Sequence, residues 1–195
     1  ASMKAFFHYE ELEQRTSADP AFELKATKVE KKAPTILTTE QTNRLLAQPK
    51  DNSAKGLRDK AMLELLYATG IRVSECVGLD ITDVDFRNNG IKVHRKGGAE
   101  VVVYFGDEVR TALLNYLEKR NTIEAVEGST NALFLSLQKK RIGVRAVENL
   151  VKKYSKLITT MKNITPHKLR STYGTSLYRE TGDIYLVADV LGHKD

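Results

Sequence analysis

The chain has 195 residues, of which 41% are hydrophobic and 29% are charged, and its net charge is +6. This length allows one domain of ordinary size, or one domain with part of another, and the composition is that of a soluble globular chain. The single cysteine, Cys76, excludes a disulfide framework or a cysteine-rich zinc module and favours a reducing, cytoplasmic setting. No run approaches the roughly 18 apolar residues of a membrane span, and no signal peptide is recognisable.

The positive charge is concentrated in residues 138–170, which hold ten basic side chains and one acidic one. This segment has a net charge of +9, so the remaining 162 residues sum to −3. A basic block inside a nearly neutral chain is typical of a surface that binds phosphates.

The N-terminal part differs in pattern from the rest. Residues 3–15 predict a short amphipathic helix, and residues 16–33 predict a basic linker because they lack a helical period. From Pro34 the pattern becomes regular. We therefore divide the chain into residues 1–33 and residues 34–195.

The next segment predicts three helices. Thr38 and Gln41 form a capping-box pattern at the start of the first. Residues 56–69 are apolar nearly all round, which predicts a buried helix, and Gly70 is placed to end it in the left-handed conformation. Ser74 is predicted to cap a short third helix.

A hairpin is predicted in the middle of the chain. Residues 88–90 carry a turn signal, and the β-branched runs 91–95 and 101–105 flank a Gly-Gly loop. Asp107 is predicted to cap a helix, and residues 132–136 are predicted to add a short strand.

Three helices are predicted in the C-terminal third. Apolar residues recur at helical spacing from Val144 to Ile158, with basic residues on the opposite side. Thr165 and Pro166 open the second helix and Asp183 caps the third, and Gly182 and Gly192 end these two helices. The fold class predicted is mainly α with a small antiparallel β-sheet (α+β).

The sequence lacks the motifs of several common activities: it has no nucleotide-binding glycine loop, no HExxH and no CxxC. Asp80, Asp83 and Asp85 do not match a calcium loop, because Arg87 occupies the fifth position of that run. We read them as a polar turn before the hairpin. No metal and no cofactor are expected.

A set of cations and imidazoles remains. Taken singly, each has an ordinary structural explanation at a helix end, a turn or the surface. Together they suit phosphoryl transfer without a metal, which needs positive charge around the non-bridging oxygens and a proton donor at the leaving oxygen. The members of this set are Arg72, Lys96, His167, Arg170 and His193.

Three segments carry a family resemblance. ATGIRVSECVGLDITDVD, a hairpin with RKGG, and TPHKLRSTYGTSLYRETGDIYLVADVLGHKD resemble the catalytic domain of the tyrosine recombinases. The resemblance covers about residues 34–195. It implies the tyrosine-recombinase catalytic-domain fold, and that residues 1–33 are the end of the core-binding domain with a linker.

The resemblance also implies roles for individual residues. Arg72 and Arg170 match the two arginines that clamp the scissile phosphate, and Lys96 matches the hairpin lysine that protonates the leaving 5′ oxygen. His167 and His193 match the histidines that bind the phosphate, and Glu75 matches a supporting acidic residue. We expect duplex DNA to be contacted by Arg95, Lys139, Lys140, Arg141, Arg145, Lys152, Lys153 and Lys156.

One departure from the family concerns the nucleophile, a tyrosine roughly nine residues beyond the LGH histidine. None of the eight tyrosines occupies that place, and Tyr173 matches an aromatic core position. We therefore expect a truncated catalytic fragment that binds DNA without cleaving it. The intact protein would recombine DNA through a 3′-phosphotyrosyl intermediate, as a DNA-directed tetramer in a bacterial cytoplasm.

The favoured role is integration and excision of a mobile element. The alternatives are a Xer-type chromosome resolvase and a DNA-binding protein without catalysis. A type IB topoisomerase shares the chemistry but is disfavoured by the TGIRVSE and LGH segments.

Overall fold

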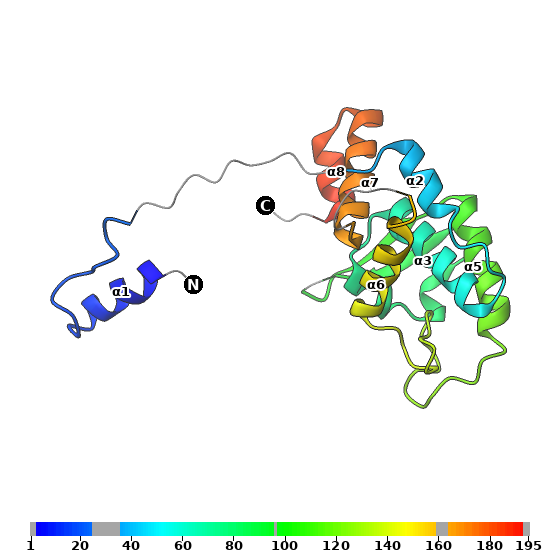
Figure 1. Ribbon diagram of the computed structural model, residues 1–195, viewed down its shortest axis with the longest axis horizontal. Helices are drawn as coiled ribbons and strands as arrows, with labels where there is room; N and C mark the ends of the chain where they lie inside the picture. Colours follow the sequence, from blue (N-terminus) through cyan, green and yellow to red (C-terminus); the bar gives the residue numbers. More distant parts are fainter. Residues whose placement is uncertain (1–2, 25–35, 96, 159–163, 193–195) are drawn as a thin grey trace. The chain divides into compact units, whose positions relative to one another are not determined.

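The computed structural model describes residues 3–24, 36–95, 97–158 and 164–192 (Figure 1). The chain divides into two compact units, residues 1–33 and residues 34–195. The first unit holds helix α1 (Met3–Leu12), every residue of which is at least partly exposed. The Lys4 ammonium donates to the Phe22 carbonyl oxygen at 3.0 Å, so the segment after α1 is joined to the helix by a side-chain contact. Among the described residues, no helix is both long and apolar enough to cross a membrane.

The second unit is built around α3 (Ala54–Thr69), whose side chains are buried on most sides, as predicted. The Ser53 hydroxyl caps its first turn, and Gly70 ends it with a φ of 60°. Helix α3 packs against α5 (Asp107–Arg120) and α7 (Pro166–Thr181). Residues distant in the sequence therefore meet along this central helix.

The sheet contains three antiparallel strands in the order β1 (Val84–Asp85), β2 (Gly90–His94) and β3 (Glu100–Tyr104). Strands β2 and β3 pair along their whole length, from Gly90 opposite Tyr104 to His94 opposite Glu100. Ile91 and Val93 of β2 are buried and attach the sheet to the helices. The predicted fold class, mainly helical with a small antiparallel sheet, is confirmed.

The other elements are α2 (Thr39–Leu46), α4 (Val73–Gly78), the 3₁₀ turn η1 (Ile81–Asp83), α6 (Val144–Ser155) and α8 (Ile184–Leu191). The predicted capping box at the start of α2 is present. Thr165 and Asp183 cap α7 and α8 through their side chains, and Gly182 and Gly192 end these helices with positive φ. Helices α7 and α8, orange and red in Figure 1, lie side by side.

One hydrophobic core holds the second unit together, and α3, α5, α6 and the sheet all contribute to it. Tyr116 of α5 lies in its centre, where its ring stacks on Phe134 at a centroid distance of 5.6 Å. The Tyr116 hydroxyl accepts a hydrogen bond from the Leu135 backbone N–H at 3.1 Å. A buried tyrosine thus has its one polar group paired, as a stable core requires.

Two predicted helix starts were wrong by one or two residues. Helix α4 begins after Arg72 and not at Ser74, and the Glu75 carboxylate in its first turn accepts the Arg72 backbone N–H at 2.7 Å. Helix α5 begins after Gly106, so Asp107 lies in its first turn and not at the cap. Glu75 and Asp107 both lie in the first turn of a helix, at the positive end of the helix dipole, where an acidic side chain is favourable.

The strand predicted at residues 132–136 was also wrong. These residues, all of them described, form two isolated bridges, between Asp80 and Ala132 and between Leu135 and Arg141. Their backbone groups bond to single residues of neighbouring loops, so no continuous ladder is built.

Candidate active site

The loop between α3 and α4 places Arg72 and Glu75. Gly70 is required there because its φ is 60° and a Cβ at this position would lie 2.4 Å from the Tyr173 ring. Arg72 Nη1 donates to Glu75 Oε1 at 2.9 Å. The Glu75 side chain is 5% exposed and that of Arg72 is 39% exposed. The carboxylate therefore orients a guanidinium group that still faces solvent.

The first turn of α7 places His167 and Arg170. His167 is exposed, whereas Arg170 is buried and donates to the backbone carbonyl oxygens of Gly70 and Leu191. Burial and, secondarily, repulsion from Arg72 lower the pKa of Arg170 to about 10, while Glu75 acts in the opposite direction. The guanidinium group therefore stays protonated at neutral pH.

Arg72, His167 and Arg170 line one cavity of about 360 Å³. It lies between the α3–α4 loop and the first turn of α7. The two guanidinium groups outnumber the one buried carboxylate that interacts with them, that of Glu75, so the site has an excess of positive charge. Such a cavity suits a phosphodiester, whose non-bridging oxygens accept hydrogen bonds from arginine. The remaining lining residues are Ile71, Val73, Ser74 and Pro166.

The carboxyl end of α8 also reaches this site. Arg72 Nη2 donates to the Gly192 carbonyl oxygen at 3.1 Å, and Arg170 donates to that of Leu191. Arg95 Nη2 donates to the Val190 carbonyl oxygen at 2.8 Å. The last carbonyls of a helix lack partners within the helix and carry partial negative charge, so they are natural acceptors for arginine.

Lys96 and His193, the other two predicted catalytic residues, lie outside the described residues. Their neighbours are described. The Arg95 N–H donates to the Ala99 carbonyl oxygen at 2.8 Å, and the Gly98 N–H donates to that of Arg95 at 3.1 Å. Gly192, directly before His193, contacts the site through its carbonyl oxygen.

Helix α6 presents a basic face. Its buried side consists of Val147, Leu150, Val151 and Tyr154, whereas Val144, predicted to share that side, is exposed. The predicted DNA contacts Lys139, Lys140, Arg145, Lys152, Lys153 and Lys156 are all exposed. These cations are on the surface and open to a polyanion.

Three of the predicted DNA contacts, Arg95, Arg141 and Lys153, make specific contacts within the fold. Arg141 pairs with Asp80 and donates to the carbonyl oxygens of Val77 at 3.1 Å and Leu79 at 2.8 Å. The Lys153 ammonium lies 4.4 Å from the centroid of the Tyr154 ring. Arg141 thus anchors the loop before α6.

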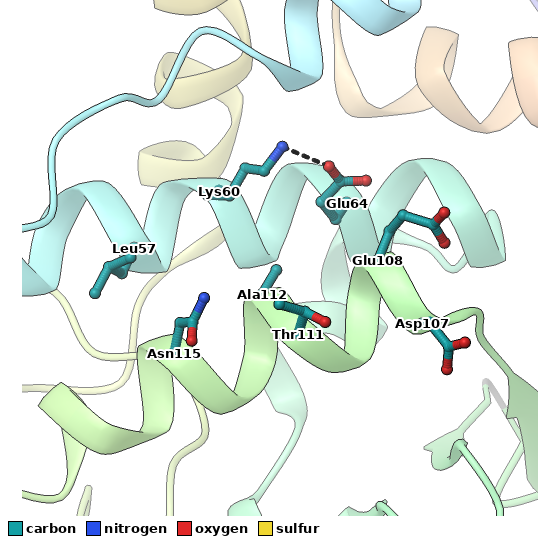
Figure 2. A pocket seen from close by; sticks show the side chains of 8 residues that line it. All are labelled: Leu57, Lys60, Glu64, Asp107, Glu108, Thr111, Ala112 and Asn115. Carbon is teal, nitrogen blue, oxygen red and sulfur yellow. Dashed lines mark ion pairs between the residues drawn. The ribbon is translucent and has the colours of Figure 1, made fainter.

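A different cavity of about 420 Å³ lies between α3 and α5. Figure 2 shows the side chains that line it, among them the acidic ones of Glu64, Asp107 and Glu108. Lys60 pairs with Glu64 at 2.6 Å and so does not offset the other two carboxylates. Excess negative charge makes this cavity unsuitable for a phosphate, although it is larger than the arginine-lined one.

Three tyrosines have structural roles. Tyr116 lies in the core, and the Tyr154 hydroxyl donates to Asp59 Oδ2 at 3.1 Å. Tyr173 packs against Gly70, and burial raises the pKa of its hydroxyl. This position agrees with the packing role expected for Tyr173.

Comparison with known proteins defines the family. The phage integrase family model matches residues 35–195. The tyrosine recombinase XerD of Staphylococcus epidermidis is 33% identical over the whole chain, which spans 66% of that protein. XerD of Neisseria meningitidis is 36% identical, and the chain spans 67% of it. The chain therefore belongs to the phage integrase family of tyrosine recombinases, and it covers about two thirds of these relatives.

Solved structures share the fold. The crystal structure of the XerA recombinase is 27% identical, with a TM-score of 0.74 over 99% of this chain and 65% of that one. A λ integrase dimer bound to a core site has a TM-score of 0.73 at 16% identity, over 99% of this chain and 69% of that one. The helical unit with its small sheet is thus the tyrosine-recombinase catalytic fold.

Proposed function

We propose that the intact protein is a site-specific DNA recombinase that cleaves and rejoins strands through a 3′-phosphotyrosyl intermediate. The observation that carries this proposal is the shared cavity of Arg72, His167 and Arg170. It brings together residues from two distant segments around a space with excess positive charge. The exposed cations of α6 supply a second surface for the DNA backbone.

In the proposed reaction, Arg72 and Arg170 donate to the non-bridging oxygens of the scissile phosphate, and His167 adds a further donor. A tyrosine oxygen attacks phosphorus, the proton of its hydroxyl passes to His167, and the bond from phosphorus to the 5′ oxygen breaks. Lys96 gives the proton to that leaving oxygen, so a free 5′ hydroxyl results. The reverse attack by another 5′ hydroxyl rejoins the strand. These roles need no metal and no cofactor.

The nucleophile would be a tyrosine beyond residue 195, since the family resemblance places it several residues after His193. The polypeptide of residues 1–195 would then bind DNA without forming a covalent adduct. Tyr116 and Tyr154 support this division of roles because both hydroxyls are paired inside the fold.

The DNA partner is supported by structures of similar proteins. XerH is described bound to a palindromic difH substrate, and the Tn1549 transposon integrase in complex with circular intermediate DNA. For this chain we propose a duplex recombination site as substrate, with DNA directing assembly of the intact protein into a tetramer in a bacterial cytoplasm.

Two biological roles fit this chemistry. Integration and excision of a mobile element is one, and the likeness in fold to a transposon integrase is compatible with it. Chromosome resolution is the second, and the identity of 33–36% to XerD proteins favours it. Mapping the sites that the protein binds in its host genome distinguishes them. One chromosomal site indicates a resolvase, and the ends of an element indicate an integrase.

The test of the chemistry is a suicide DNA substrate with a nick beside the cleavage site. We expect a covalent protein–DNA adduct with the whole encoded protein and none with residues 1–195. An adduct from residues 1–195 would show that one of their own tyrosines is the nucleophile. Tight binding without any adduct from the whole protein would instead support a DNA-binding protein without catalysis.

A further inference from the structure

Arg95 directly follows β2 and begins the loop of the β2–β3 hairpin. Its backbone N–H donates to the Ala99 carbonyl oxygen and its carbonyl oxygen accepts from Gly98, at 2.8 and 3.1 Å. Lys96 follows Arg95 directly in the chain. Arg95 is therefore the described residue that directly precedes the proposed proton donor in the chain.

The Arg95 side chain leaves the hairpin and reaches the carboxyl end of α8. Nη2 donates to the Val190 carbonyl oxygen at 2.8 Å, and Nη1 donates to that of Asp189 at 3.4 Å. Both acceptors lie in the last turn of the helix, where positive charge is favourable. The hairpin and the helix, which are far apart in sequence, are thus joined by one side chain.

Gly192 fits this contact closely. A Cβ at this position would lie 2.1 Å from Arg95 Nη1 and 2.6 Å from Cζ, and the φ of Gly192 is 62°. The guanidinium group thus occupies the space that a side chain at residue 192 would fill. Within the described residues, Arg95 Nε–H is buried without a hydrogen-bond partner. This unpaired donor is costly, so the contacts with α8 must outweigh it.

The same end of α8 accepts hydrogen bonds from three arginines. Arg170 donates to Leu191 and Arg72 to Gly192, next to the two carbonyls that bind Arg95. Two of these arginines belong to the proposed phosphate site. The third belongs to the hairpin. The carboxyl end of α8 therefore connects the hairpin to the phosphate arginines.

We propose that Arg95 is a positioning residue that holds the β2–β3 hairpin against the carboxyl end of α8. This contact sets the position of the hairpin relative to Arg72 and Arg170. The inference rests on the proposed function, since it assigns Arg95 to the delivery of the proton from the hairpin lysine. It replaces the sequence-based expectation that Arg95 contacts DNA.

The contact itself can be measured without catalysis. In residues 1–195, we expect Arg95→Ala to raise amide hydrogen exchange about tenfold in both the hairpin and the last turn of α8, as loss of charged hydrogen bonds predicts. Arg95→Lys keeps the charge but not the two-pronged geometry, so we expect partial protection. Lys92→Ala is the matched control, because Lys92 is an exposed cation on β2, the strand that ends directly before Arg95, and its partner is Glu100 at 3.6 Å and not α8. Unchanged exchange in α8 for Arg95→Ala would overturn the proposal.

The catalytic consequence is tested in the whole encoded protein with two suicide substrates, one natural and one with sulfur replacing the scissile 5′ oxygen. A thiolate leaves without protonation, so it does not need the hairpin lysine. We expect Arg95→Ala to slow cleavage of the oxygen substrate about 100-fold, as a displacement of about 1 Å can. Cleavage of the sulfur substrate should be largely restored, and Arg95→Lys should be intermediate on the oxygen substrate.

Three outcomes separate the possibilities. Equal slowing on both substrates would overturn the positioning role. A decrease of about 0.9 in the magnitude of the slope of log K against log salt for Arg95→Ala would also overturn it, because it would make Arg95 a phosphate contact. Absence of adducts from the unmodified protein on both substrates would refute the proposed recombinase function, while the exchange measurement would still decide whether the contact exists.

Discussion

The two cationic regions of this protein, the arginine site and the basic face of α6, hold their charges in different ways. Arg170 is buried and donates to two backbone carbonyl oxygens, and Arg72 is fixed by Glu75 and Gly192. On α6, Arg145 and Lys152 are exposed. One region therefore has fixed geometry, and the other is an open surface.

This difference separates two tasks of a protein that acts on DNA. Preorganised charges stabilise a transition state because they need not rearrange during the reaction. Exposed lysines and arginines gain affinity by releasing counterions, which depends on their number more than on their orientation. Substitutions in the arginine site should therefore change rates, and substitutions on α6 should change affinity and its salt dependence.

The largest effect is expected from Arg170→Ala. It removes a phosphate donor and leaves the Gly70 and Leu191 carbonyl oxygens without their partner. We expect cleavage by the whole protein to fall about 10²- to 10³-fold, and the free energy of unfolding to fall by about 1–3 kcal/mol. Suicide-substrate kinetics and urea unfolding measure the two losses. Arg179→Ala, an exposed change on the same helix, is the control, and an Arg170→Ala protein that cleaved normally would remove Arg170 from the site.

A smaller effect is expected from charge reversal on α6. We expect log K for duplex DNA to fall with log salt with a slope near −5, for about six phosphate contacts. Arg145→Glu with Lys152→Glu should reduce the magnitude of this slope by about 1.8 and weaken binding at least about tenfold. Fluorescence anisotropy over a salt series measures both. Arg87→Glu with Lys119→Glu makes the same charge change at exposed positions outside α6, and equal weakening by this pair would show that α6 is not the DNA surface.

The smallest effect is expected from Tyr154→Phe, which removes the hydrogen bond from α6 to Asp59 on α3. Burial, reinforced by Asp59, raises the pKa of Tyr154 to about 12. The folded state therefore binds a proton more tightly than the unfolded state, and stability should fall as the pH rises from about 10 to about 12. Tyr154→Phe should cost about 1 kcal/mol at neutral pH and flatten that fall.

Urea unfolding near pH 7 and near pH 11 tests this, with Tyr185→Phe as the exposed control. A Tyr154→Phe protein with unchanged stability and unchanged pH dependence would mean that the buried contact does not anchor α6. Unchanged DNA affinity in the same variant would show that the exposed face works independently of this anchor.

Local features were the most predictable from the sequence. The capping box of Thr38 and Gln41, the left-handed Gly70 and the Thr165–Pro166 helix start all follow from rules that involve a few neighbouring residues. The errors arose where a distant or charged partner replaced the expected group. Helix α4 begins after Arg72, whose backbone N–H the Glu75 carboxylate accepts, and Ser74 lies inside its first turn.

Motifs and periodicity lie in consecutive residues, so the family, the helical elements, the hairpin and the types of side chain that could bind a phosphate could be predicted from the sequence. Which of these charged side chains have a fixed orientation depends on the tertiary structure. In the folded protein Arg72 and Arg170 line one cavity, Arg141 pairs with Asp80, and Arg95 donates to a backbone carbonyl oxygen of α8. A guanidinium group donates to the acceptors that lie nearest in space, whatever their position in the sequence. The backbone carbonyls at the end of a helix become its neighbours only once the chain has folded.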